Sequence, residues 1–295
     1  MKKYVALYNP YALSNSGADC AKKLLEFYDE QQIEFVDITA VKYDDLFSAL
    51  SDSTLIICGG DGTLNRFIND TKNLTLPDNI LYYACGSGND FLTDIGGKAG
   101  ERPLKLNKYI SDLPTVAVNG KSYLFLNNVG FGIDGYCCEV GDQLRKQSDK
   151  PVNYAGIAIK GLLGKFHTRN ATVMVDGVLH TYKHVWLAPT MKGRFYGGGM
   201  MIVPTQDRTE KTVSVAVLHC PLKLKTLIVF PNIFKGTHIK HGEMYECFSG
   251  NDITVKFDRP TALQIDGETV LGVTEYSVCT HLCPKSAENK TTVSA

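Results

Sequence analysis

The first 115 residues alternate between apolar runs of strand length and amphipathic runs of helical spacing. The apolar runs lie at 3–10, 33–39, 54–58 and 79–85, and the helical runs lie between them at 17–32, 42–51 and 64–70. Parallel strands need a crossover between them, so this alternation predicts a parallel sheet with helices on both faces. We therefore predict a Rossmann-like α/β domain over residues 1–115.

The rest of the chain has a different pattern. Short β-branched runs often alternate polar and apolar residues, and turn signals such as Asn119-Gly120, Asp176-Gly177 and 250–252 separate them. This pattern predicts an all-β sandwich domain over residues 116–284, interrupted by helices at 154–165 and 223–236. A polar tail follows at 285–295.

Composition excludes some classes of function. The 295 residues include 31 Lys+Arg and 31 Asp+Glu, so the global charge gives no sign of a nucleic-acid-binding protein. No apolar run approaches the roughly 18 residues of a membrane helix, and the N-terminal run is too short for a signal peptide. Nine cysteines, with Cys58, Cys85 and Cys220 inside apolar runs, favour buried thiols in a reduced, cytoplasmic protein.

The run Gly59-Gly60-Asp61-Gly62-Thr63 directly follows the apolar run 54–58. Ligands of open α/β sheets bind beyond the carboxyl ends of the strands, where glycines allow close approach and a helix N-terminus offers N–H groups to phosphate. Asp61 would repel a bare phosphate, so it indicates a divalent cation or a phosphoryl acceptor between them. The alternative is a glycine-rich turn in which Asp61 caps a helix.

Two other predicted strands end in similar residues. Gly86-Ser87-Gly88-Asn89-Asp90 follows one apolar run, and Asn9-Pro10 ends the first. Three such ends on one edge of a sheet predict a nucleoside triphosphate site.

Four motifs together resemble the diacylglycerol kinase catalytic-domain family, which includes bacterial diacylglycerol kinases and sphingosine kinases. They are the elbow 9–10, "GGDGTLN" at 59–65, "GSGNDF" at 86–91 and "QIDGE" at 264–268, in the family's order. The resemblance implies a nucleotide-binding α/β domain followed by a lipid-binding β-sandwich domain. It also implies ATP- and Mg2+-dependent phosphorylation of a lipid hydroxyl at a membrane surface, with diacylglycerol as the favoured acceptor.

The resemblance also assigns roles to residues. Asp61 is expected to orient the metal and the γ-phosphate, and Asp266 and Glu268 to take the lipid hydroxyl proton, with Glu268 the preferred base. A hairpin with surface acids is the alternative for that pair. The expected nucleotide contacts are Asn9, Thr39, Gly59, Gly60, Asp61, Gly62, Thr63, Asn65, Gly86, Ser87, Gly88, Asn89 and Asp90.

The segment 203–215 departs from the family pattern. The resemblance implies a structural magnesium bound with the help of an Asp-Gly pair, whereas Thr209, Glu210 and Lys211 stand at the matching positions. Asp207 and Glu210 are the ligands expected in their place.

Other interpretations stay open. "GFGIDG" at 130–135 matches a dinucleotide-binding pattern, although Ala155 stands where the acidic residue is expected. The glycines in "RFYGGGMMIVP" at 194–204 suit a closely approached loop or a β-bulge. Residues 211–242 contain lysines without acids and suit either a helix packed on the sandwich or a contact with an anionic bilayer. An NAD-kinase-like soluble kinase and a non-catalytic lipid- or nucleotide-binding relative are the alternative functions.

Overall fold

A computed structural model describes residues 2–50, 52–86, 89–147, 152–164 and 166–281. Its N-terminal part contains a five-stranded sheet in the order β2-β1-β3-β4-β5. Four strands are parallel: β1 (Tyr4–Tyr8), β2 (Ile33–Asp37), β3 (Thr54–Gly59) and β4 (Ile80–Ala84). The short β5 (Leu104–Lys105) is antiparallel at one edge. The predicted parallel sheet is confirmed, with this edge strand making it mixed.

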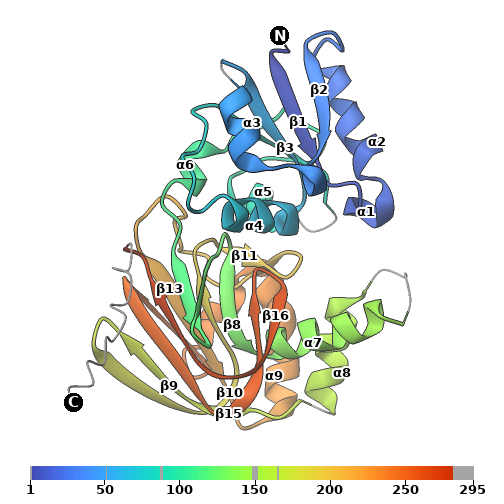
Figure 1. The fold of residues 1–295 in the computed structure, drawn as a ribbon. Coiled ribbons are helices and arrows are strands. Elements are labelled where there is room, and N and C mark those ends of the chain that lie inside the picture. Colours follow the sequence, from blue (N-terminus) through green and yellow to red (C-terminus); the bar gives the residue numbers. More distant parts are fainter. Residues whose placement is uncertain (1, 51, 87–88, 148–151, 165, 282–295) are drawn as a thin grey trace, which may run out of the picture.

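Helices cover both faces of this sheet (Figure 1). In β3, Leu55 and Ile57 pack into a core on one face with Phe67, while Ile56 packs on the other face with Leu24, as the two-residue period of a strand requires. The helical elements are α1 (Ala12–Asn15), α2 (Gly17–Lys22), η1 (Lys23–Glu26), η2 (Ile38–Ala40), α3 (Tyr43–Ala49), α4 (Asp61–Asp70), α5 (Asp90–Asp94) and α6 (Asn107–Ile110).

The C-terminal part is built on a nine-stranded antiparallel sheet. Its longest strands, β10 (Val178–Met191) and β15 (Asp252–Ile265), each pair with β8 at one end and with β9 at the other, which folds the sheet into two layers. The remaining strands are β6 (Thr115–Val118), β7 (Lys121–Leu124), β8 (Asn128–Gly132), β9 (Arg169–Val175), β13 (Val213–His219), β14 (Tyr245–Gly250) and β16 (Glu268–Cys279), with a separate hairpin of β11 (Phe195–Tyr196) and β12 (Met200–Met201). The predicted sandwich-like domain is confirmed.

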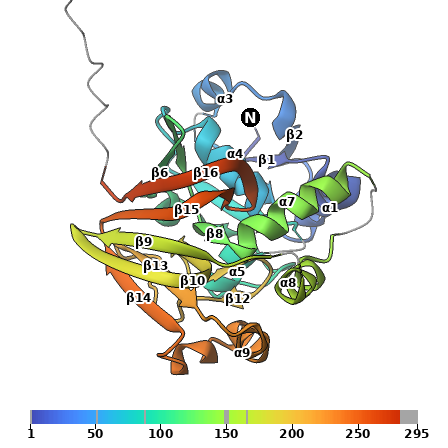
Figure 2. The ribbon, with the colours of Figure 1, turned by 90° about the horizontal axis from the view of Figure 1, so that it is seen from below.

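Two hydrophobic cores stabilise this part. Phe131, Phe257 and Tyr276 lie in the core between the layers, and Trp186 and Phe230 lie in a core under the helices. Those helices flank the sheet (Figure 2): α7 (Ile133–Arg145), α8 (Tyr154–Leu163), α9 (Lys223–Val229), η3 (Phe230–Lys235) and η4 (Thr237–Lys240). Of these, α8 and the run of α9 and η3 confirm the two predicted helical interruptions, whereas α7 was not predicted. No helix in the described part of the chain is long and apolar enough to cross a membrane.

The glycine pattern at 130–135 lies where β8 meets α7. Both neighbours of β8 in the sheet, β10 and β15, run antiparallel to it. A dinucleotide-binding pattern requires a parallel β-α-β unit, so that interpretation is wrong.

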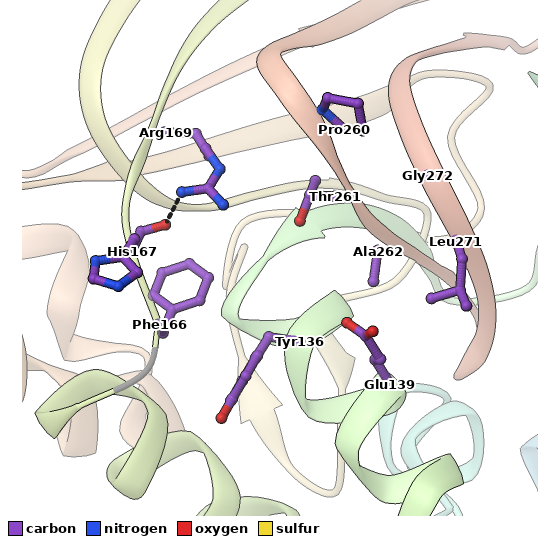
Figure 3. A pocket seen from close by; sticks show the side chains of 10 residues that line it. All are labelled: Tyr136, Glu139, Phe166, His167, Arg169, Pro260, Thr261, Ala262, Leu271 and Gly272. Carbon is purple, nitrogen blue, oxygen red and sulfur yellow. Dashed lines mark hydrogen bonds between the residues drawn. The ribbon is translucent and has the colours of Figure 1, made fainter.

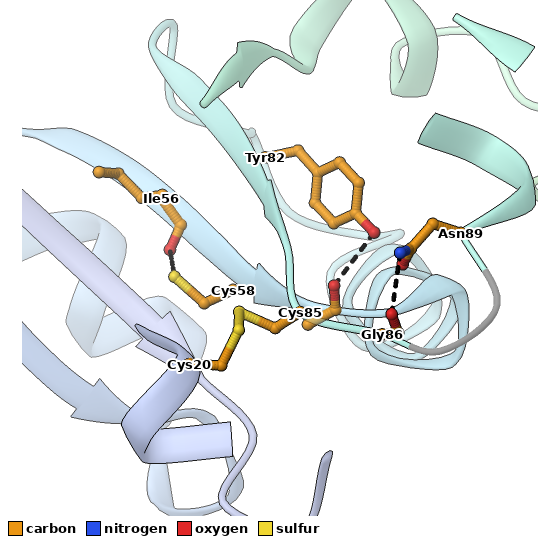
Figure 4. The surroundings of a disulfide bond; sticks show 8 residues. Cys20, Ile56, Cys58, Tyr82, Cys85, Gly86 and Asn89 are labelled. Atoms are coloured by element: carbon orange, nitrogen blue, oxygen red, sulfur yellow. Dashed lines mark hydrogen bonds between the residues drawn. A yellow bond between two sulfur atoms is a disulfide. The ribbon is translucent and has the colours of Figure 1, made fainter. Parts of the chain in front are cut away.

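One cysteine expectation is also wrong. Cys85, predicted to be a buried free thiol, forms a disulfide with Cys20 of α2 (Figure 4). The bond links α2 to the residue that lies between the end of β4 and the loop that begins at Gly86. Cys58 and Cys220 are buried free thiols, as predicted.

Candidate active site

Two glycine-rich loops touch at the carboxyl edge of the parallel sheet. The Cys85 N–H donates to the Gly59 carbonyl at 2.8 Å, so the chain after β4 lies against the end of β3. A Cβ on Gly86 would lie 2.6 Å from the Cα of Gly60, which explains why both positions need glycine. The Tyr82 hydroxyl also donates to the Gly59 carbonyl, at 3.0 Å. The sequence therefore predicted correctly that these loops converge.

Asp61 is the first residue of α4, and its carboxylate is only partly satisfied. Oδ2 accepts hydrogen bonds from the Asp90 N–H at 2.9 Å, the Phe91 N–H at 3.4 Å and the Asn127 side-chain amide at 3.2 Å. Oδ1 is buried and has no hydrogen-bond partner among the described residues. A buried acceptor without a donor is costly in a folded protein, so this oxygen is suited to bind a ligand.

The electrostatics of the site favour a cation. Burial raises the pKa of Asp61 from 3.8 to about 7, and the negative charges of Asp90 and then Asp266 add to this shift. A divalent cation here would offset the negative charge that gathers at Asp61.

Asn89 supplies a second oxygen without a partner. Its amide donates to the Gly86 carbonyl at 2.8 Å, while its Oδ1 is buried and has no partner among the described residues. Magnesium prefers oxygen ligands such as carboxylates and amide carbonyls. The residues present therefore fit a Mg2+–nucleotide complex held by Asp61 and Asn89.

Asp266 lies in the turn between β15 and β16, with a left-handed φ of 46°. Its Oδ1 accepts from the backbone N–H groups of Asn127 at 2.7 Å and Asn128 at 2.9 Å. Its Oδ2 accepts from the Leu126 N–H and from the Asn65 side-chain amide at 2.8 Å. Both oxygens therefore accept protein donors, and the Asn65 bond crosses to the α/β domain. The proton-accepting role of Asp266 stays a prediction.

Glu268 begins β16 and is exposed. Its carboxylate is therefore available to a substrate, in contrast to that of Asp266. The base role stays a prediction, with Glu268 the preferred residue of the pair.

The Asp90 carboxylate also accepts hydrogen bonds from the protein. Its two carboxylate oxygens accept from the backbone N–H groups of Gly198 at 2.8 Å and Gly199 at 2.7 Å. Both glycines have positive φ values, 83° and 100°, in the turn between β11 and β12. The glycine run at 197–199 is thus a closely approached turn that Asp90 docks, and the nucleotide contact of Asp90 stays a prediction.

The other predicted nucleotide contacts lie around the same edge. Asn9 accepts from the Tyr11 N–H at 3.0 Å, and Thr39 is exposed and bonded to Asp37. Gly62 is exposed, whereas Thr63 is buried beneath Gly59. Ser87 and Gly88 lie outside the described residues, and Asn65 is used by Asp266.

The predicted metal ligands of the 203–215 segment do not form a site. Asp207 is exposed, and its Oδ1 accepts from the Thr209 N–H at 2.8 Å and the Thr209 hydroxyl at 2.7 Å. These bonds lower the pKa of Asp207. Glu210 is also exposed, and its backbone carbonyl accepts from the Lys192 ammonium at 2.6 Å. The described residues include no cluster of three His, Cys, Asp or Glu side chains that could hold a metal.

A cleft of about 300 Å³ lies in the β domain, apart from the glycine-rich loops. Side chains from α7, the start of β9 and the β15–β16 hairpin surround it (Figure 3). Tyr136, Phe166 and Leu271 give it apolar walls, while Glu139 and Arg169 add charge. The hairpin that borders this cleft also carries the turn with Asp266 and Glu268.

Sequence reasoning missed the residues that join the domains. Asn127 donates to Asp61, Arg208 donates to Asn127 and to Asp94, and Arg194 also binds Asp94. Asn127 and Arg208 belong to no glycine-rich motif, and their partners lie far away in sequence. Arg194 opens the glycine-containing segment 194–204, and this segment and the departure of 203–215 from the family pattern were the two signals that pointed to this region.

Comparisons with known proteins agree with this architecture. The diacylglycerol kinase catalytic domain model matches residues 3–116, and the YegS C-terminal NAD kinase beta sandwich-like domain model matches residues 127–286. The chain belongs to the diacylglycerol kinase catalytic-domain family. It is therefore a lipid kinase, a phosphotransferase with a nucleotide-binding domain.

Relatives span nearly the whole chain. A diacylglycerol kinase of Mycobacterium tuberculosis is 23% identical over 304 residues, covering 97% of this chain and 91% of the relative. A crystal structure of a diacylglycerol kinase from Bacillus anthracis str. Sterne aligns with a TM-score of 0.57 at 16% identity, covering 94% of each chain. Another structure from that organism aligns with a TM-score of 0.66 at 16% identity, covering 94% of this chain and 92% of the other. At this identity the two structures support the fold alone.

Proposed function

We propose that this protein transfers the γ-phosphoryl group of ATP, with Mg2+, to the hydroxyl of diacylglycerol and so forms phosphatidic acid, a step of phospholipid biosynthesis. The observation that carries the proposal is the buried Oδ1 of Asp61, which has no hydrogen-bond partner among the described residues and belongs to one of two touching glycine loops. Bound Mg2+ would neutralise phosphate charge. The diacylglycerol kinase among the relatives supports the choice of acceptor.

The protein's own residues then divide the work. Asp61 and Asn89 offer oxygens to the cation, and the N–H groups at the start of α4 face the phosphates. The exposed carboxylate of Glu268 accepts the proton of the attacking hydroxyl. Asp266 keeps the 126–128 segment in place beside them.

The cleft bordered by Leu271 suits the acceptor. Its apolar walls match acyl chains, and Glu139 and Arg169 match a polar ester and hydroxyl region. The β15–β16 hairpin leads from this cleft to Glu268. We propose that the lipid lies along this hairpin with its hydroxyl toward Glu268.

The lipid would reach that cleft from a bilayer docked on α8 and α9. We call this the α8–α9 surface. Its exposed apolar residues are Ile159 and Leu163 of α8, Leu222, and Leu224 and Ile228 of α9. Leu224, Ile228 and Leu163 are 72%, 66% and 64% exposed. The α9 segment also packs inward through Val229 and Phe230, as the packed-helix interpretation expects, and its other face is the one proposed to meet the bilayer.

Basic residues accompany these apolar side chains. Lys160 and Lys223 are exposed, and the Lys223 ammonium lies 3.4 Å from the Gly164 carbonyl at the end of α8. Lys225 is paired with Glu243 at 2.7 Å and so contributes less. Exposed apolar groups beside lysines suit an anionic membrane interface. A cytoplasmic protein that binds the bilayer peripherally fits this arrangement.

A labelled-ATP assay across a panel of acceptors tests the proposed reaction. The panel consists of vesicles that carry diacylglycerol, vesicles that carry a sphingoid base, vesicles without an acceptor, and soluble NAD. Labelled product should form only with the diacylglycerol vesicles, and only when Mg2+ is present. Transfer to NAD alone would establish the soluble-kinase alternative. No transfer to any acceptor, with ATP still bound, would establish a non-catalytic relative.

Vesicle sedimentation tests the α8–α9 surface. Changing both Lys160 and Lys223 to Gln should weaken binding to anionic vesicles about 30-fold, since each basic residue near such a surface contributes about 1 kcal/mol. Activity on detergent-dispersed acceptor should stay unchanged. The matched control changes Lys22 and Lys23, which are exposed on the α/β domain. Equal losses in both pairs would contradict a specific docking surface.

A further inference from the structure

Arg208 is a buried cation at the junction of the two domains. Its side chain is 4% exposed, and its partner Asp94 is 2% exposed. The guanidinium donates to Asp94 Oδ2 at 2.7 Å, to the Leu126 carbonyl, and to Asn127 Oδ1 at 2.7 Å. A carboxylate, a backbone carbonyl and an amide carbonyl are also the groups that hard metal ions bind.

The surrounding chain is shaped around this guanidinium. It lies 4.8 Å from the centre of the Phe91 ring. A Cβ on Gly193 would lie 2.1 Å from Arg208 Nη2 and 2.6 Å from Asp94 Oδ2. Position 193 is therefore glycine because the ion pair packs directly against its backbone.

Lys192 supplies a second basic side chain nearby. It is a buried residue, 4% exposed, and its ammonium donates to the Glu210 carbonyl at 2.6 Å. Burial lowers the pKa of Lys192, and the nearby charge of Arg208 lowers it further. Lys192 thus already uses a backbone oxygen of the segment where the family resemblance implies a structural magnesium, and Arg208 is itself part of that segment. A third cation there would be repelled.

We propose that Arg208 is a positioning residue for Asp61, acting through Asn127, and that Arg208 and Lys192 replace the structural magnesium of the family. The inference rests on the proposed kinase function for its effect on rate. The replacement of the structural magnesium by Arg208 and Lys192 does not depend on that function.

The relay follows from the chemistry of a side-chain amide. Asn127 accepts from Arg208 through Oδ1 and donates to Asp61 Oδ2 through Nδ2. An amide can rotate to exchange its oxygen and nitrogen, and the exchanged form would place Oδ1 against the Asp61 carboxylate. A guanidinium can donate only, so Arg208 fixes the orientation in which Asn127 supports Asp61.

The substitution Arg208→Lys tests the relay. A lysine keeps the charge but lacks the planar set of donors that reaches Asp94, Leu126 and Asn127 together. The single-turnover rate, divided by the number of ATP-binding sites counted by titration, should fall at least tenfold with the ATP Kd unchanged. Counting sites in this way removes any contribution from unfolded protein.

Arg194→Lys is the matched control. Arg194 binds Asp94 Oδ1 at 2.8 Å from the more exposed side. Its rate per site should stay within twofold of the wild type. If Arg208→Lys does not fold, Asn127→Ala interrupts the same relay and should show the same loss. A normal rate per site in Arg208→Lys or in Asn127→Ala, or equal losses in the two arginine variants, would overturn the relay.

Thermal unfolding tests the replacement of the metal without any assay of activity. Tm of the full-length protein is measured without nucleotide, in EDTA and in Mg2+. The same two Tm values are measured for the Asp61→Asn variant. This variant lacks the proposed cation ligand at position 61, so a cation bound there cannot cause a difference between EDTA and Mg2+. The proposal expects equal Tm values in that variant, and a drop of several degrees in EDTA would refute it. If the wild type shows no kinase activity, the proposed function fails while this measurement still decides the metal.

Discussion

Asp61 and Asp266 are both aspartates beside a strand end, and both accept hydrogen bonds from Asn127. They differ in what remains unpaired. Asp266 receives four N–H donors that cover both oxygens, whereas Asp61 has one buried oxygen with no donor among the described residues. Burial raises the pKa of each, but only at Asp266 do donors to both oxygens oppose the shift.

This difference distinguishes the proposed ligand-binding carboxylate of Asp61 from the structural carboxylate of Asp266. A buried polar atom is normally paired, so an unpaired one in an otherwise well-packed region indicates a missing partner such as a cation. A fully paired carboxylate has no lone pair to offer a substrate. In the proposed function Asp61 thus serves the reaction and Asp266 serves assembly, although each follows or precedes a glycine in a similar motif.

The largest expected effect is on turnover in Asp61→Asn. Removing the charge eliminates the proposed cation contact, and the rate should fall by about 10³-fold or more. The circular dichroism spectrum should match that of the wild type. A rate within tenfold of normal would reduce Asp61 to a helix cap.

Asp266→Asn should act on stability instead. An amide nitrogen would face a backbone N–H, leaving buried donors unpaired, so unfolding should be easier by about 3 kcal/mol. Urea denaturation measures this loss. Asp258→Asn, an exposed position on the same strand β15, is the control and should change little. An Asp266 variant as stable as this control would show that the four hydrogen bonds contribute little.

Glu268→Gln should lower the rate of phosphoryl transfer by about 10²-fold, the lower range for losing a general base. ATP affinity and stability should be unchanged, because the side chain is exposed and lies outside the nucleotide domain. Single-turnover kinetics with a separate ATP titration measure both quantities. A normal rate would direct the search for the base back to Asp61.

A smaller effect concerns stability and pH. Because burial raises the pKa of Asp61 to about 7, the folded protein binds this proton more tightly than the unfolded chain. The free energy of unfolding should therefore fall as pH rises from about 4 to about 7. In EDTA and without nucleotide, Asp61→Asn should be more stable than the wild type by on the order of 4 kcal/mol at pH 8 and nearly equal at pH 4. Equal stability at both pH values would contradict the burial of an unpaired charge.

The parts of the fold predicted from sequence are those set by local pattern. The runs that became β1 to β4 alternate with helices over short distances, and glycine spacing alone indicated the loops at Gly59 and Gly86. The helical interruptions in the β domain were also visible locally as apolar runs with lysines.

The remaining features depend on contacts distant in sequence. Asp266 bonds to Asn65 across 201 positions, and Arg208 bonds to Asn127 across 81. The disulfide joins cysteines 65 positions apart. No periodicity indicates which donor will cover a given carboxylate, so the sequence could name Asp61 and Asp266 but could not distinguish their roles.

The most direct test of that distinction measures Asp61→Asn and Asp266→Asn side by side. The quantity is the single-turnover rate per ATP-binding site, recorded together with the free energy of unfolding. We predict that Asp61→Asn is at least as stable as the wild type at neutral pH and loses nearly all of its rate per site, whereas Asp266→Asn is less stable and keeps a rate per site within tenfold. The reverse result, an active Asp61 variant and a stable but inactive Asp266 variant, would contradict the account.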